Sequence, residues 1–285
     1  MEWQFEHFKT FTPYEIMQQA AASLLIFEGQ NTDGSNPKMT NLINELSVNT
    51  GHPSWMPARD TGNIRVNKEG SVFRNKARLF SSFYICVPPN LLKSEGIPKE
   101  VMLTDFGRAL GSGKINKEKF YTYIVKKFEY PHLSFSDYQD WVDLGVRIRP
   151  LILIIKTLVM LFEKHGLAHS YLTSTEIYKH LQPLMDEDST EAVKDIIDYR
   201  KKDLDNLPTD TVRKINEMLS FLSIAGYLVV DSTDRNNIKY WLNLVSRHPN
   251  EKTLYFLERS ASGAGTGVKK VKVNIIEQYK KLWED

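Results

Sequence analysis

Residues 72–131 decide the expected fold, and they read VFRNKARLFSSFYICVPPNLLKSEGIPKEVMLTDFGRALGSGKINKEKFYTYIVKKFEYP. The first part, Val72–Tyr84, has the period of an amphipathic helix with one apolar and one basic, amide-bearing face. Apolar residues at Tyr84–Val87 and Val101–Leu103, separated by a loop opening at Pro88, predict a β-hairpin. A basic helix followed by a hairpin is typical of the second half of a winged helix-turn-helix, which fits a major groove and its phosphates. The alternative is an ordinary surface helix with a solvated charged face.

Two further helices follow this hairpin. Thr104 is a suitable N-cap for a short helix that stops at Gly111. The next helix spans Lys117–Tyr130, with Phe120 among the residues of its apolar stripe. It must end before Pro131, because the residue preceding a proline avoids the α region.

Several short motifs in this half of the chain resemble one family. Their order is a Leu-Thr-x-x-Gly-x-x-Leu turn, a helix ending Lys-Phe-Glu-Tyr-Pro, an Arg-Pro-Leu helix start and a later acidic helix ending in arginine: Leu103–Leu110, Lys127–Pro131, Arg149–Leu151 and Glu191–Arg200. This set is similar to the DNA-recognition half of AlwI-type restriction endonucleases, the group of type IIS and strand-nicking enzymes. The resemblance spans roughly residues 72–200. It implies a chain that recognises DNA, followed in the family by a linker and a nuclease domain.

Composition is that of a folded globular protein. The chain has 285 residues, 41% of them hydrophobic and 25% charged, and a formal net charge of +2. The charge is unevenly distributed: residues 114–127 hold five lysines against Glu118, whereas residues 186–205 hold eight acids against four bases. A basic front with an acidic back suits a protein that lays one face on a polyanion; a mixed, solvated surface is the alternative.

The same composition argues against several classes of protein. No stretch approaches ~18 uninterrupted apolar residues, so a membrane span is not expected. The N-terminal residues include acids and lack an apolar core, so a secretory signal is not expected. The single cysteine, Cys86, excludes an internal disulfide and any multi-cysteine zinc site, and its apolar strand predicts a buried thiol. A cytoplasmic protein is the simplest expectation.

The expected fold class is α+β, mostly helical, with tandem winged helix-turn-helix subdomains. Residues 1–133 form the first, with helices over 14–27, 39–48 and 72–84. Residues 134–259 form the second, in which Pro150 opens a helix that is apolar almost all round. This second subdomain continues with helices over 176–184, 187–202 and 210–226, a hairpin over 227–244 and a strand over 252–259. Residues 260–285 are expected to form a flexible link and a basic C-terminal helix.

The candidate DNA contacts follow from this arrangement. They are the basic and amide residues of the first recognition helix, of the long loop before it, and of the second recognition helix and its wing: Arg59, Arg65, Lys68, Arg74, Asn75, Lys76, Arg78, Arg213, Lys214, Asn216, Arg235, Asn236 and Asn237. Arginine and lysine pair with guanine edges and asparagine with adenine, while the remaining cations suit phosphates. For the loop and the wing tip, a solvated surface is the alternative.

Catalytic chemistry is not evident in the sequence. A nuclease of the resembled family needs acids on adjacent strands that bind Mg²⁺, with a lysine beside the attacking water. No acid-x-Lys motif lies on a convincing strand. His165 and His169 are four positions apart, but they span the break at Gly166, so surface histidines are the simpler interpretation. We therefore predict no catalytic residue, metal site or cofactor in this chain, with Mg²⁺ expected only in an attached nuclease domain or partner subunit.

The sequence thus predicts a protein that recognises a specific, asymmetric site in double-stranded DNA, as part of a type IIS or nicking-type endonuclease. A stand-alone winged-helix regulator, or another defence-system protein, is the main alternative, and a palindromic site would favour it. A protein-interaction module is a third possibility. A self-sufficient enzyme would need a metal site that the sequence does not reveal.

Overall fold

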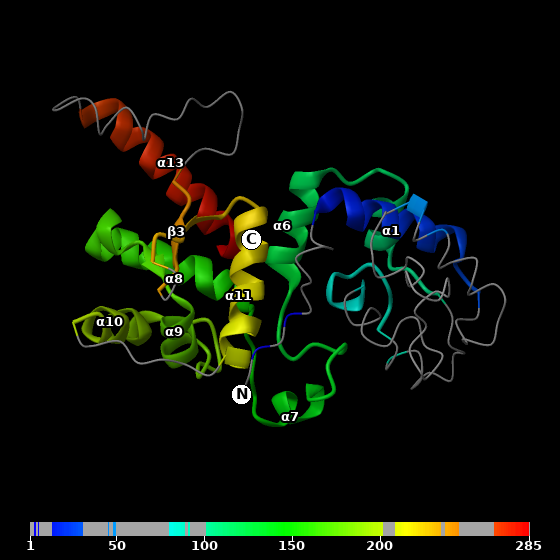
Figure 1. Cartoon of the computed structure of the whole chain (residues 1–285), viewed down its shortest axis with the longest axis horizontal. Coiled ribbons are helices and arrows are strands. Elements are labelled where there is room, and N and C mark those ends of the chain that lie inside the picture. The colour runs from blue at the N-terminus through cyan, green and yellow to red at the C-terminus, as the bar shows by residue number, and fades with distance from the viewer. Residues whose placement is uncertain are drawn as a thin grey trace. The chain divides into compact units, whose positions relative to one another are not determined.

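The structure is a computed structural model that describes residues 3, 5, 13–30, 45, 48–49, 80–88, 91, 101–201, 209–234, 237–244 and 265–284, apart from the side chains of 209–212 and 265–274. The chain divides into two compact units (Figure 1). The N-terminal unit comprises Phe5–Ile124 and Phe128–Val146, and the C-terminal unit comprises Met1–Gln4, Val125–Lys127 and Arg147–Asp285. The division at Val146 lies beyond the domain boundary expected at residue 133. Helix 265–284 also falls within the C-terminal unit, not outside both subdomains.

The described helices of the N-terminal unit pack around an aromatic core. These helices are α1 (Tyr14–Ile26), α5 (Asp105–Gly111), α6 (Lys117–Lys127, whose last turn falls in the other unit) and α7 (Tyr138–Asp143). Phe5 and Phe128 meet edge to face, with ring centroids 4.8 Å apart, and Phe83 stacks on Phe120. The helices α1 and α5 approach closely at Gly111, where a Cβ atom would lie 2.7 Å from the carbonyl oxygen of Ala21.

The C-terminal unit combines helices with a small antiparallel sheet. Its elements, in chain order, are α8 (Pro150–His165), a 3-10 turn (Leu167–His169), β1 (Tyr171–Leu172), α9 (Ser174–Glu176) running into a π turn (Ile177–Leu181), α10 (Thr190–Tyr199), α11 (Thr209–Ile224), β2 (Leu228–Asp231), β3 (Lys239–Leu242) and α13 (Gly265–Glu284). The strand order is β1-β3-β2, with Tyr171 opposite Trp241 and Val229 opposite the same tryptophan. Helix α8 is buried along most of its length, because its apolar residues surround the whole helix.

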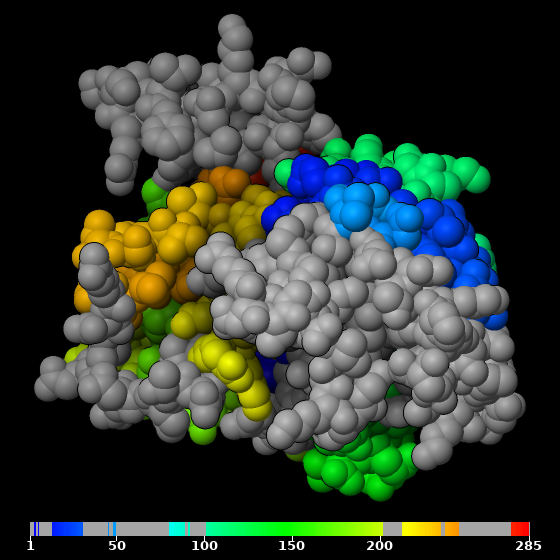
Figure 2. Space-filling view, turned by 45° about the vertical axis from the view of Figure 1, so that its right-hand side comes forward, coloured from blue at the N-terminus to red at the C-terminus, as the bar shows by residue number. Residues whose placement is uncertain are grey.

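Most of the predicted elements that fall on described residues are present. An antiparallel bridge between Cys86 and Leu103 falls on the first predicted hairpin, although its predicted arms, 84–87 and 101–103, do not form regular strands. Strands β2 and β3 confirm the second hairpin. Pro150 occupies the first turn of α8 as predicted. The overall class is confirmed as α+β and mostly helical. In Figure 2 the β2–β3 hairpin, in yellow and orange, lies at the surface.

Several elements differ from the predictions, among them α6, which ends at Lys127 and not at Tyr130. The predicted connector 131–146 contains α7, and the predicted helix 187–202 is shorter, Thr190–Tyr199. The helix predicted over 176–184 ends at Leu181, because Pro183 cannot donate a backbone hydrogen bond. Helix α13 begins at Gly265, inside the segment expected to be a flexible link. In the later part of α13, where side chains are described, Ile275, Ile276, Tyr279 and Leu282 are buried, and such tertiary packing stabilises a helix.

Some predicted elements lie outside the described residues. These are most of the helices predicted over 39–48 and 72–84 and the whole strand predicted over 252–259. Of the first recognition helix, the structure describes the last turn, with residues 80–82 helical. Within the described part of the chain, no helix combines the length and the apolar character that crossing a bilayer requires.

Candidate nucleic-acid interface

Helix α11 and the β2–β3 hairpin carry the described candidate contacts of the C-terminal unit. Ile215, Leu219 and Leu222 of α11 are fully buried, which fixes the rotation of the helix about its axis. Arg213 lies on the opposite side and is exposed, whereas Lys214 lies on a flank and is half-buried. An exposed arginine on a helix held by its apolar face can extend its guanidinium fork to a base edge or a phosphate.

Asn216, which is predicted to face outward and contact DNA, does not point outward in the structure. Its side-chain oxygen accepts a hydrogen bond from the Ser174 hydroxyl at 2.5 Å and lies 3.4 Å from the Tyr240 hydroxyl. The amide therefore connects α11 with α9 and β3, and Asn216 is half-buried. The helical period left this flank of α11 undecided, because Ser174 is 42 positions away in sequence. A direct role for Asn216 in contacting DNA stays a prediction.

The tip of the β2–β3 hairpin is a tight polar turn. The Asp231 carboxylate accepts hydrogen bonds from the backbone N–H of Thr233 at 3.1 Å and from its hydroxyl at 2.7 Å. These bonds lower the pKa of Asp231. The backbone N–H of Asn237 donates to the carbonyl of Asp234 at 3.2 Å. Of the three predicted wing-tip contacts, Asn237 is half-buried, while Arg235 and Asn236 lie outside the described residues.

A buried ion pair connects several elements of this unit. The Arg200 guanidinium donates to the Glu176 carboxylate at 2.6 Å, and the two side chains are 9% and 2% exposed. Arg200 also donates to the carbonyl oxygens of His169 and Tyr171 and lies 3.8 Å from the centre of the Tyr171 ring. The arginine that ends the Glu191–Arg200 motif thus joins α10 to α9 and β1.

Sequence reasoning missed this pair, although one signal pointed to it. Thr173 and Glu176 have the spacing of a capping box. In the structure the Thr173 hydroxyl accepts from the Glu176 N–H at 3.2 Å, and the Glu176 carboxylate accepts from the Thr173 N–H at 2.8 Å. A capping glutamate that is also buried requires a cation, and Arg200 supplies it.

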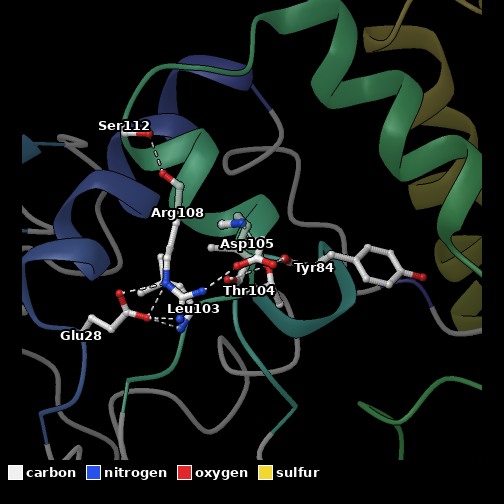
Figure 3. Close-up of polar contacts among 9 residues, drawn as sticks. Glu28, Tyr84, Leu103, Thr104, Asp105, Arg108 and Ser112 are labelled. Atoms are coloured by element: carbon white, nitrogen blue, oxygen red, sulfur yellow. Dashed lines mark hydrogen bonds and ion pairs between the residues drawn. The ribbon is translucent and has the colours of Figure 1, made fainter.

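In the N-terminal unit, the Leu103–Leu110 motif braces the segment that follows the predicted recognition helix (Figure 3). The Thr104 hydroxyl accepts from the Gly107 N–H at 2.9 Å and donates to the Tyr84 carbonyl. Tyr84 has a φ of 57°, a left-handed conformation that is uncommon for a residue other than glycine. Thr104 therefore caps α5 and secures the turn at Tyr84 at the same time.

Two further members of the motif complete the brace. Arg108 pairs with Glu28, with nitrogen and carboxylate oxygen 2.7 Å apart, and with Asp105 at 2.9 Å, contacts that Figure 3 shows. Glu28 also accepts from the Leu103 N–H at 3.3 Å. A Cβ atom at Gly107 would lie 2.1 Å from the Ile85 carbonyl oxygen, so this position requires glycine. The motif residues that carry the resemblance thus connect α5 to Glu28 and to the segment at Tyr84 and Ile85.

The predicted contacts of the N-terminal unit lie outside the described residues: Arg59, Arg65, Lys68, Arg74, Asn75, Lys76 and Arg78. Among described residues, α6 presents a basic surface. Lys119 is exposed and precedes Tyr123 by one turn on the same helix face. The Tyr123 ring is stacked on Phe106, with centroids 3.9 Å apart and planes 13° apart. Lys117, two positions earlier, instead pairs with Glu15 at 3.5 Å.

The buried titratable groups of the N-terminal unit are neutral near pH 7. Burial lowers the pKa of His132 to about 4, and its Nδ1 accepts from the Ser134 N–H at 3.2 Å. Burial, with a smaller effect from Glu28, raises the pKa of the half-buried Cys86 thiol to about 12. Both groups are therefore uncharged at neutral pH. Among described residues, no three His, Cys, Asp or Glu side chains converge as a metal site would require.

Comparison with known proteins gives the family. Residues 110–283 match the family model described as restriction endonuclease BpuJI, N terminal. The chain therefore belongs to the family of N-terminal regions of BpuJI-like restriction endonucleases. The match confirms the restriction-enzyme recognition domain that the motifs indicated, whereas the AlwI-type assignment stays a prediction.

A solved structure has a similar fold. It is the BpuJ1 endonuclease binding domain, crystallised with pyrene- and phenanthrene-modified DNA. The likeness has a TM-score of 0.58 at 12% sequence identity and covers 100% of this chain and 98% of the other. No curated protein sequence matches the chain.

Proposed function

We propose that this chain recognises a specific sequence in double-stranded DNA, as the target-recognition part of a restriction endonuclease. The family supports the enzyme class, and the fold is shared with a domain crystallised with DNA. In this proposal the chain binds the site, and cleavage is performed by a further domain or a partner subunit, where Mg²⁺ would act.

The observation that carries the proposal is the order of elements in the C-terminal unit. Apart from α10, which lies between α9 and α11, the order is a helix (α8), a short strand (β1), a helical turn (α9), the long helix α11 and the β2–β3 hairpin, with strand order β1-β3-β2. This order supports a winged helix, in which α11 would be the recognition helix and the hairpin the wing. Helix α10 is then an insertion, joined to the rest by Arg200.

The N-terminal unit supports a second, similar module. Its described parts include the last turn of the predicted recognition helix and the Cys86–Leu103 pairing that begins its hairpin. The brace at Thr104 and Arg108 would hold this helix and hairpin at one angle. Two unlike modules in one chain would read two adjacent stretches of DNA, which suits an asymmetric site of the type IIS or nicking kind.

The test is selection from a randomised duplex pool at two salt concentrations, with the bound sequences read out. We expect one short asymmetric motif and an affinity that falls steeply with salt, because bound phosphates release counterions. Arg213→Ala should weaken binding to the selected duplex about tenfold and relax the preference at one base pair. Arg147→Ala, which removes an exposed arginine ahead of α8, is the matched control and should change neither.

Each other outcome has a definite meaning. A palindromic motif would replace the proposal with the stand-alone regulator. Equal losses for Arg213→Ala and Arg147→Ala would remove α11 from the reading surface. Failure to retain any duplex at low salt would overturn DNA recognition altogether.

A further inference from the structure

The hydroxyl of Tyr279 joins the C-terminal helix to the base of the β2–β3 hairpin. It lies 2.6 Å from the carbonyl oxygen of Asn243, just after β3, and 3.1 Å from that of Tyr227, just before β2. A phenol carries one proton, so the hydroxyl shares it between carbonyls on both arms of the hairpin. Tyr279 is 4% exposed, so water does not replace these bonds easily.

The base of the hairpin needs such a restraint. Gly226, which separates α11 from β2, has a φ of 81°, in the left-handed region where glycine is conformationally free. Two bonds from Asn243 limit that freedom: its side-chain amide donates to the Gly226 carbonyl at 2.8 Å, and its backbone N–H donates to the Tyr227 carbonyl at 2.9 Å. The Tyr279 hydroxyl adds bonds to the carbonyls of Tyr227 and Asn243 from α13, outside the hairpin.

Helix α13 is itself anchored on α8, independently of the hairpin. Lys280 pairs with Glu163 at 2.9 Å. Ile275, Ile276 and Leu282 are buried on the same helix. One turn of α13 thus holds two adjacent residues with different partners, Tyr279 on the hairpin and Lys280 on α8. This separation makes the two connections testable one at a time.

We propose that Tyr279 is a positioning residue for DNA recognition, which fixes the angle between α11 and the hairpin through α13. The inference rests on the proposed function, because it assumes that α11 and the hairpin contact the duplex. Since the same hydroxyl contacts both arms, DNA bound at the hairpin stabilises the docked α13, and a docked α13 favours DNA binding. Coupling of this kind is reciprocal by thermodynamic necessity.

The experiment compares Tyr279→Phe with Lys280→Ala in the full chain. Tyr279→Phe removes the hydroxyl and with it the hydrogen bonds to the carbonyls of Tyr227 and Asn243. Lys280→Ala instead removes the ion pairs with Glu163 of α8 and with Glu277 of α13 itself. In free protein, we expect amide exchange in residues 228–231 and 239–242 to speed up about tenfold in Tyr279→Phe, and much less in Lys280→Ala. On the selected duplex, Tyr279→Phe should weaken binding about tenfold, again more than the control.

A double-mutant cycle with Asn237→Ala separates positioning from general loosening. If Tyr279 acts through the hairpin, Asn237→Ala should cost little further affinity once Tyr279→Phe is present. The DNA-induced slowing of exchange in residues 275–284 should also disappear in Tyr279→Phe. Additive losses, or equal effects of Tyr279→Phe and Lys280→Ala, would overturn the proposal.

The exchange measurement also separates this inference from the proposed function. If the wild-type chain binds no duplex, the proposed function and the coupling to DNA both fail. If the chain binds DNA normally and Tyr279→Phe leaves hairpin exchange unchanged, only the positioning role fails.

Discussion

Replacing Arg200 by methionine should destabilise the C-terminal unit by about 3–5 kcal/mol, the usual cost of removing one partner of a buried ion pair. Methionine keeps the apolar part of the side chain and removes the guanidinium. The Glu176 carboxylate, 2% exposed, would then keep the N–H of Thr173 at 2.8 Å but lose its cation. The carbonyls of His169 and Tyr171 would lose a donor at the same time.

The neighbouring residue provides a matched control. Lys201 pairs with Asp198 at 2.7 Å, but both side chains are about two-thirds exposed, at 68% and 65%. Lys201→Met should therefore cost no more than about 0.5 kcal/mol, as exposed ion pairs do. Free energies of unfolding from urea denaturation measure both variants, and amide exchange in α9 and α10 assigns the loss to this unit.

A second variant tests the reason for the cost. In the double variant Glu176→Gln, Arg200→Met no charge is buried without a partner, so it should be more stable than Arg200→Met alone. A loss of less than about 1 kcal/mol in Arg200→Met would show that water or another cation reaches Glu176, contrary to its burial in the structure. A double variant no more stable than the single one would show that packing, not the stranded carboxylate, sets the cost.

Three further predictions concern the N-terminal unit. Gly107→Ala should lower the free energy of unfolding by about 3 kcal/mol or more, because the new Cβ would meet the Ile85 carbonyl. Helix propensity alone would instead raise it by about 1 kcal/mol, so the direction of the change in thermal unfolding distinguishes the two effects. Burial lowers the pKa of His132 from an ordinary 6.5 to about 4, so the unfolded chain binds the proton more readily than the folded one. The free energy of unfolding should therefore be highest above pH 6.5 and fall by about 3 kcal/mol as the pH drops to 4. Unfolding followed between those pH values should show a shallower loss in His132→Phe; an unchanged slope would assign it to other groups. If the basic surface of α6 contacts phosphate, Lys119→Ala should reduce the salt slope of duplex binding by about 0.9, while Lys117→Ala, paired on another face, should not.

Local patterns in the sequence determined much of the fold. The apolar periods of α1, α6 and α11, the continuous apolar run of α8 with its opening proline, the cap at Thr104 and the β2–β3 hairpin depend on residues close together in the chain, where spacing is informative. The motif set also indicated a restriction-enzyme recognition domain, a class that the family match confirms.

Only the tertiary structure decided what the motif residues do. Arg108 meets Glu28 across 80 positions, and Arg200 meets Glu176 across 24, so no local pattern could pair them. The same holds for Asn216, which bonds to Ser174 and faces inward, and for Tyr279, which reaches the hairpin base. Helical periodicity tells which side of a helix is apolar. The partner of a polar residue on its flank depends on where distant segments pack, and that is settled only when the chain folds.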